Sequence, residues 1–153
     1  MANVYISRPE LFGAVHCAFP LLDMKRFKEM SGDVPSWIEE FGDPDSRDWS
    51  KFLKDYSPYH NINQSNKKYP PILFTACNTD QRAHPGHARK MVKKLWDLGK
   101  GKRWPTYYYE ILDGGSGSAG YSKQYAFITS LAYDFLWRTL SKNAEKERRK
   151  SES

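Results

Sequence analysis

Three short segments rich in apolar and aromatic residues are spaced along a chain whose other stretches are polar or amphipathic. They are residues 12–19 (FGAVHCAF), 71–77 (PILFTAC) and 106–112 (TYYYEIL). Each has the length of a strand, and strands that are apolar throughout are typical of a parallel sheet covered on both faces. The pattern therefore predicts an α/β fold with about three parallel strands and flanking helices.

Two further stretches, 85–98 and 121–140, carry apolar residues at helical spacing and are expected to form helices. The apolar side consists of Ala88, Met91, Val92, Leu95 and Trp96 in the first, and of Ala126, Phe127, Leu131, Phe135, Leu136 and Leu140 in the second. Residues 1–8 are expected to be the end of a helix. The polar and aromatic stretch 24–60 predicts two or three short helices.

The chain has 153 residues, enough for one folded domain with its own core. We expect this domain to occupy residues 1–140. Residues 141–153 are dominated by charged side chains, so this tail is expected to be disordered or a frayed helix.

Lysine and arginine exceed aspartate and glutamate by six, which gives the chain a formal charge of +6. Much of the excess lies in two clusters: Lys93, Lys94, Lys100, Lys102 and Arg103, and Lys142, Lys146, Arg148, Arg149 and Lys150. Such clusters are compatible with a basic adaptor that binds nucleic acid or a ribonucleoprotein. Glutamates interrupt the second cluster, so solvated helix faces and a soluble tail explain the charge better.

The two cysteines, Cys17 and Cys77, both lie in apolar segments. Two cysteines are too few for a disulfide framework, so we expect buried thiols and a cytoplasmic or other reducing intracellular compartment. The first residues lack the pattern of a signal peptide. No apolar run approaches the roughly 20 residues that a membrane-spanning helix needs, so no membrane partner is expected.

The strand predicted at 12–19, from Phe12 to Phe19, has only a helix end before it. Its outer edge would then be an apolar strand edge without a pairing partner, which proteins usually avoid. We therefore expect another protein chain to cover this edge.

Eight stretches, spread over nearly all of the chain up to residue 140, resemble the C-terminal half of the catalytic domain of the prolyl oligopeptidase family of serine peptidases. They are RPELFGAV (8–15), PLLDM (20–24), WIEEFGDPD (37–45), YSPYHN (56–61), YPPILFTA (69–76), HPGHARKM (84–91), YYEILDGG (108–115) and LAYDFLWRTL (131–140). The resemblance implies a partial α/β-hydrolase fold.

The resemblance also implies roles for four residues. Asp80, in Asp80-Gln81-Arg82, matches the aspartate of the catalytic triad, which orients the histidine. Arg82 matches an arginine that binds a backbone carbonyl of the substrate. Trp37 matches an indole that stacks on the substrate proline, and Phe41 stands at a tyrosine position of the same pocket. A weak binding of proline-containing peptides is therefore expected.

Two departures from the family pattern argue against catalysis by this chain alone. The family histidine lies in a G-G-H-G loop, but this chain has Ser116 at that position. A serine hydroxyl cannot take up a proton near neutral pH as imidazole does. The nucleophile elbow, G-x-S-x-G, lies upstream of the matching region in the family. Ser118 follows the third predicted strand instead of the strand that carries an elbow, so we do not assign it as the nucleophile.

Several other residues admit a chemical and a structural interpretation. His84 and His87 are three residues apart, as zinc ligands can be, but they match ordinary helix-start positions of the family. His16 and Cys77 lie in predicted strands and are expected to be buried rather than catalytic. Trp96, Phe127, Phe135 and Trp137 are expected to be core or interface residues. We expect no metal or other cofactor.

The sequence leaves three hypotheses open. The first is a catalytically inactive relative of prolyl oligopeptidases that acts as a binding or structural subunit of a larger assembly. The second is half of a serine-type peptidase, completed by another chain. The third is the basic adaptor for nucleic acid.

Overall fold

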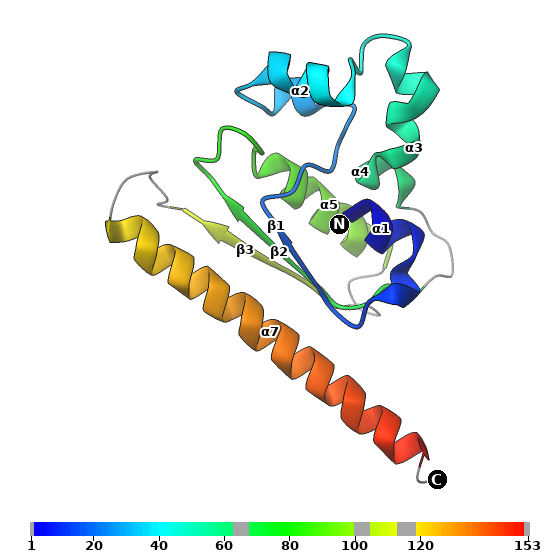
Figure 1. Cartoon of the computed structure of the whole chain (residues 1–153), viewed down its shortest axis with the longest axis vertical. Coiled ribbons are helices and arrows are strands. Elements are labelled where there is room, and N and C mark those ends of the chain that lie inside the picture. The colour runs from blue at the N-terminus through cyan, green and yellow to red at the C-terminus, as the bar shows by residue number, and fades with distance from the viewer. Residues whose placement is uncertain (1, 63–67, 100–104, 113–118, 152–153) are drawn as a thin grey trace.

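The computed structural model describes residues 2–62, 68–99, 105–112 and 119–151 (Figure 1). The strands β1 (Val15–Ala18), β2 (Ile72–Cys77) and β3 (Thr106–Ile111) form a parallel sheet in the order β1-β2-β3. Val15 lies opposite Ile72, and Ile72 lies opposite Thr106. The predicted parallel α/β arrangement is thereby confirmed.

The first strand is shorter than the sequence predicts. The backbone forms a 3₁₀ turn at η1 (Pro9–Leu11) just before it. At its other end Phe19 adopts a φ of +44°, in the left-handed region that side chains rarely occupy. The turn at Phe19 ends the extended backbone, and four residues of the eight-residue apolar segment pair as a strand.

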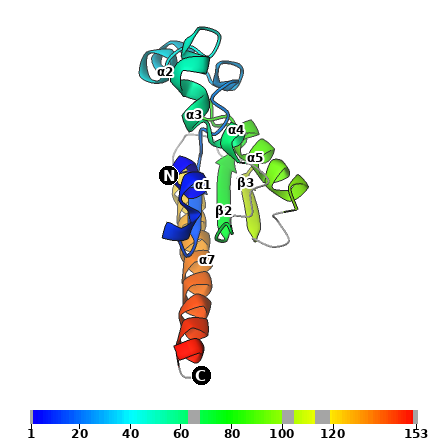
Figure 2. The same cartoon turned by 90° about the vertical axis from the view of Figure 1, so that its right-hand side faces the viewer.

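Helices lie on both faces of the sheet (Figures 1 and 2). On one face lie α1 (Ala2–Ser7) and α5 (Gly86–Asp97), and on the other α7 (Ala119–Ser151) crosses the sheet. The helix α7 continues through the charged segment that we expected to be disordered or frayed, up to Ser151. Helical structure there is compatible with its lysine, arginine and glutamate content, because these residues have good helix propensity.

Between β1 and β2 the chain forms several short helices, more than the two or three predicted. Their bounds are η2 (Phe27–Glu29), α2 (Val34–Phe41), a π-helical turn η3 (Trp49–Leu53), α3 (Lys54–Tyr56) and α4 (Pro58–Asn61). They enclose a small core of Met24, Phe27 and Leu53, rimmed by aromatic side chains.

The main core lies between the sheet and the helices α1 and α5. It contains alternate strand residues together with the inner sides of both helices: Tyr5, Ile6, Val15, Cys17, Leu22, Ile62, Tyr69, Ile72, Phe74, Ala76, Ala88, Met91, Val92 and Leu95. The four smaller residues predicted for the inner side of α5 are all buried. Trp96 is the exception, because it turns out to be 54% exposed.

The face covered by α7 is much less closed. Ile128 and Ala132 are buried, but the expected core or interface residues Phe127 and Trp137 are 52% and 75% exposed. Phe127 lies beside the Tyr109 ring, with ring centres 5.4 Å apart. None of the helices in the described parts of the chain has the length and hydropathy needed to span a membrane.

Candidate functional site

The loop that follows β2 places Asp80 at the carboxyl end of the sheet, where α/β folds build their sites. One carboxylate oxygen of Asp80, Oδ1, accepts hydrogen bonds from the backbone N–H groups of Arg82 at 2.9 Å and Ala83 at 3.0 Å. The Asp80 N–H donates to the carbonyl of Cys77 at 3.2 Å. These bonds fix the carboxylate at the turn and keep it partly open to solvent.

Asp80 borders a cavity of about 470 Å³ between this loop and the segment after η2. The cavity is lined by Glu29, Met30, Ser31, Gly32, Asn78, Thr79, Asp80, Gln81 and His84. Two backbone hydrogen bonds tie its walls together: Gly32 N–H to the Gln81 carbonyl at 2.6 Å, and His84 N–H to the Met30 carbonyl at 3.3 Å. A side chain at Gly32 would come within 3.2 Å of the Gln81 carbonyl oxygen, so this close approach favours glycine.

The other predicted binding residues lie in different surroundings. Arg82 is exposed on the same loop as Asp80. Trp37 and Phe41 lie on α2, where their rings are 5.6 Å apart and rim the small aromatic core. In the described part of the chain, neither aromatic ring lines the Asp80 cavity. Ser116 and Ser118 lie outside the described residues.

Sequence reasoning missed a buried polar cluster around Asp23, which follows β1. The Asp23 side chain is fully buried and pairs with Lys90 of α5, with Arg26 at 3.3 Å, and with His60 of α4 at 3.9 Å. Burial alone would raise the pKa of Asp23, but the hydrogen bond and charge of Lys90 hold it below the usual value. Asp23 therefore remains ionised and joins three separate segments of the chain.

His87, on the first turn of α5, is the second member of this cluster. Its Nδ1 accepts a hydrogen bond from the Asp23 N–H at 3.2 Å, which places the ring proton on Nε2. Burial lowers the pKa of His87 to about 4, so the ring is neutral near pH 7. Nε2 is buried and has no hydrogen-bond partner within the described ranges.

Ser57, His60 and Asp23 form an arrangement that superficially resembles a catalytic triad. The Ser57 hydroxyl and His60 Nδ1 are 2.8 Å apart, and His60 Nε2 faces Asp23. However, Ser57 is fully buried, and its oxygen also accepts the Met24 N–H at 3.1 Å. A nucleophile must reach the substrate, so this serine has a structural role.

These residues belong to stretches that carried the family resemblance: Asp23 to PLLDM, Ser57 and His60 to YSPYHN, and His87 and Lys90 to HPGHARKM. The motifs could have drawn attention to them. Their contact could not be foreseen, because Asp23 and His87 are 64 residues apart in sequence.

The two histidines considered as metal ligands accept hydrogen bonds from the backbone instead. His84 Nδ1 accepts the Gly86 N–H at 3.0 Å, and His87 Nδ1 is used by Asp23. Among the described residues, no group of three or more histidine, cysteine, aspartate or glutamate side chains could hold a metal ion.

The remaining candidate residues, two cysteines and His16, lie in the strands and contact neighbouring side chains. Cys17 and Cys77 are buried thiols, and burial raises the pKa of Cys17 to about 12. His16 is half-buried on β1, and its Nε2 lies 3.0 Å from the Thr75 hydroxyl of β2. Both observations agree with the structural interpretation of these residues.

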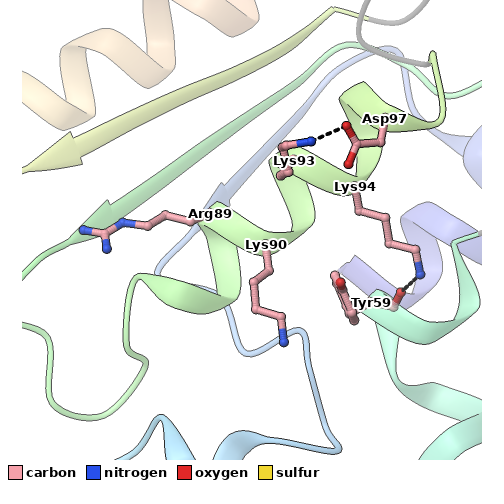
Figure 3. A pocket seen from close by; sticks show the side chains of 6 residues that line it. All are labelled: Tyr59, Arg89, Lys90, Lys93, Lys94 and Asp97. Atoms are coloured by element: carbon pink, nitrogen blue, oxygen red, sulfur yellow. Dashed lines mark hydrogen bonds and ion pairs between the residues drawn. The ribbon is translucent and has the colours of Figure 1, made fainter.

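A second cavity, of about 390 Å³, lies along α5 and is lined by Tyr59, Arg89, Lys90, Lys93, Lys94 and Asp97 (Figure 3). The Lys90 and Lys94 nitrogens lie 4.7 and 4.5 Å from the centre of the Tyr59 ring, within cation–π range. Carboxylates pair with Arg89, Lys90 and Lys93. Because these cations already have anionic partners, the cavity adds little support to the nucleic-acid hypothesis.

Comparison with known proteins agrees with this geometry. Residues 1–142 match the prolyl oligopeptidase family. The chain is 38% identical over 138 residues to the uncharacterized peptidase y4nA of Sinorhizobium fredii, and 38% identical over 133 residues to the uncharacterized peptidase RP174 of Rickettsia prowazekii. These matches cover 90% and 87% of this chain but 18% of each relative, so the chain spans about one fifth of their length.

Solved structures give the same result. The post-proline cleaving enzyme from Rickettsia typhi aligns with a TM-score of 0.64 and 39% identity, over 76% of this chain and 16% of that one. Prolyl oligopeptidase B from Galerina marginata aligns with a TM-score of 0.80 over 92% of this chain and 20% of that one, and at 22% identity it supports the fold alone. The chain therefore belongs to the prolyl oligopeptidase family and corresponds to a part of its catalytic α/β-hydrolase domain.

Proposed function

We propose that this chain is a catalytically inactive binding or structural subunit of a larger assembly, built on part of a prolyl oligopeptidase catalytic domain. The observation that carries the proposal is Ser116, in Gly114-Gly115-Ser116-Gly117, where the family resemblance calls for the histidine base. Acyl transfer by a serine peptidase needs a group that takes the proton from the nucleophile and returns it to the leaving group. A serine hydroxyl does neither near neutral pH.

The rest of the inherited site supports a binding role. Two backbone N–H groups hold the Asp80 carboxylate, and a cavity large enough for a few side chains lies beside it. Arg82 is exposed next to it and could bind a peptide carbonyl. A proline-containing peptide is the ligand that the family resemblance suggests, in a reducing compartment suited to the two buried thiols.

The free edge of β1 supports the subunit role. Among the described strands, β1 pairs with β2 alone. The N–H groups of Val15 and Phe19 bond to the β2 side, so the alternate residues His16 and Ala18 direct their backbone groups to the open edge. An added parallel strand from another polypeptide would pair there, and the upstream part of a hydrolase sheet has the right chemistry.

The second hypothesis, half of an active peptidase, rests on the same preserved Asp80 turn. It differs in one respect, because a partner chain would have to supply the base that Ser116 does not provide. One experiment separates the two hypotheses.

The chain is co-expressed with the upstream part of the catalytic domain of the Rickettsia typhi enzyme, which contributes a strand and a nucleophile. We expect a complex on gel filtration and no cleavage of a proline aryl ester above the level of the upstream part alone. Ser116→His is expected to restore turnover in the same complex, and adding Asp80→Asn should remove it again. This pair of variants controls for correct assembly.

Each outcome has a clear meaning. Turnover by the complex with the natural Ser116 would favour the active-half hypothesis and end the proposal of inactivity. Absence of a complex would contradict the subunit role. Ala18→Pro blocks the open edge, while Ala18→Ser leaves it intact, so only the proline variant should prevent assembly.

A further inference from the structure

Two segments that are far apart in sequence form the walls of the Asp80 cavity. All of its lining residues lie either in 29–32, at and after the end of η2, or in 78–84, after β2. The first wall leads directly into α2, which carries Trp37. We propose that Gly32 is a positioning residue that holds this wall, and with it α2, at a fixed distance from the Asp80 turn.

Two backbone hydrogen bonds form a junction between the walls. The Gly32 N–H donates to the Gln81 carbonyl at 2.6 Å, and the His84 N–H donates to the Met30 carbonyl at 3.3 Å. Among the described residues, these are the backbone hydrogen bonds that connect the stretch 24–56 to the loop after β2. The separation of the two walls therefore depends on these contacts.

Each side of the junction has a glycine where the other side comes closest. A Cβ at Gly32 would lie 3.2 Å from the Gln81 carbonyl oxygen, and a Cβ at Gly86 would lie 3.1 Å from the Met30 sulfur. The φ of Gly32 is not in the left-handed region, so contact alone opposes a side chain there. A methionine side chain can rotate away from such a contact, but a hydrogen-bonded carbonyl cannot. A larger residue at Gly32 therefore separates the walls.

The junction links the two parts of the candidate binding site by a short path. Gln81 directly precedes Arg82, and α2 begins two residues after Gly32. The Trp37 N–H donates to the Asp33 carbonyl at 3.4 Å, which joins the first turn of α2 to the residue next to Gly32. A peptide that contacts both Arg82 and Trp37 needs these two side chains at a constant separation. This consequence for binding rests on the proposed function, whereas the constant separation itself does not.

A distance measurement between two spin labels tests the positioning role without any ligand. Nitroxides are attached to Ser36→Cys on α2 and to Arg82→Cys on the turn, which are exposed positions. The native Cys17 and Cys77 are buried and should not react. Double electron–electron resonance should give one narrow distance distribution. Gly32→Val should broaden this distribution and shift it to longer distances, and Gly32→Ala, which adds one methyl group, should shift it less.

Gly99→Ala is the matched control. Gly99 has a φ of +69°, so alanine strains the backbone there, but no atom lies within 4 Å of the added Cβ. This variant loses stability at a position outside the junction, and it should leave the distance distribution unchanged. Urea denaturation of both variants compares their stability and so separates lost positioning from a general loosening of the fold.

Peptide binding measures the functional consequence. In an NMR titration of the chain with a short proline-containing peptide, Gly32→Val should weaken binding about fivefold, the equivalent of one net backbone hydrogen bond. Gly99→Ala should leave the affinity unchanged. If the unaltered chain bound no such peptide, the proposed function would be contradicted, and the spin-label distances would still decide the positioning role.

An unchanged distance distribution in Gly32→Val, or equal broadening in Gly99→Ala, would overturn the proposal. If Gly32→Val does not fold, amide hydrogen exchange in the unaltered chain decides instead. The Gly32 and His84 amides should then exchange about tenfold or more slowly than in an unstructured peptide. Rapid exchange of both amides would show that the junction does not hold the walls together.

Discussion

The two faces of the sheet differ in how completely they are closed. On the side of α1 and α5, Tyr5, Phe74, Met91 and Leu95 are each at most 1% exposed. On the side of α7, the strands present the polar pair His16 and Thr75, and the helix buries fewer large side chains. The same three strands therefore support one finished core and one face that still exposes aromatic surface.

The closed face and the face of α7 therefore differ in role: the first stabilises the fold, and the second exposes side chains for interaction. The closed face contributes most of the favourable free energy of folding, because burial of apolar area is the main favourable term in folding. Exposed aromatic side chains on α7 contribute little to folding and are available for association. The contrast leads to three predictions, which begin with the largest effect.

Truncation of side chains on the two faces should have unequal effects. Leu95→Ala removes a fully enclosed side chain and should lower the free energy of unfolding by about 3–4 kcal/mol. Ile128→Ala, on the face of α7, should cost about 1–2 kcal/mol, because water and neighbouring side chains can fill the space. Urea denaturation of both variants measures the difference. Equal losses would mean that α7 seals its face as tightly as α5 does.

The buried cluster on the closed side should depend on the Asp23 charge. Asp23→Asn leaves the half-buried Lys90 ammonium facing a buried neutral amide and should cost about 2–3 kcal/mol. The matched control is Asp97→Asn, which breaks the exposed pair with Lys93 and should leave stability nearly unchanged. If both variants were equally stable, Asp23 would not link β1, α4 and α5 as we argue.

His87 should make stability depend on pH. Its pKa is about 4 in the folded chain, against an ordinary value of 6.5 when the chain is unfolded, so the unfolded state binds more protons between these values. This stabilising contribution is therefore complete above about pH 6.5 and is lost as the pH falls towards 4. Between pH 7.5 and 4.5 we expect the free energy of unfolding to fall by about 2 kcal/mol.

His87→Gln keeps an acceptor for the Asp23 N–H but does not titrate, so it should remove most of that loss. His16 and His60 also have lowered pKa values and act in the same direction, so a small slope should remain. The free energy of unfolding is measured by urea titration at both pH values. An unchanged slope in His87→Gln would show that another group causes the pH dependence.

The contrast between the faces also shows where sequence patterns predict well. For α5, the small and branched apolar residues at helical spacing lie in the core, as predicted. For α7, the same kind of pattern did not place Phe127 and Trp137 in the core of this chain, because a periodic apolar face does not say what covers it. Apolar residues lie on two sides of α7, and the sheet covers one of these sides.

The sequence by itself determined the order of strands and helices, the family, and the serine in Gly114-Gly115-Ser116-Gly117, where the family resemblance leads us to expect a histidine. These features depend on local composition and spacing, which the chain carries directly. The tertiary structure decided the rest: the Asp23, His60 and His87 cluster, and the open side of α7. Each of these depends on contacts between residues far apart in sequence, and only packing in three dimensions selects them.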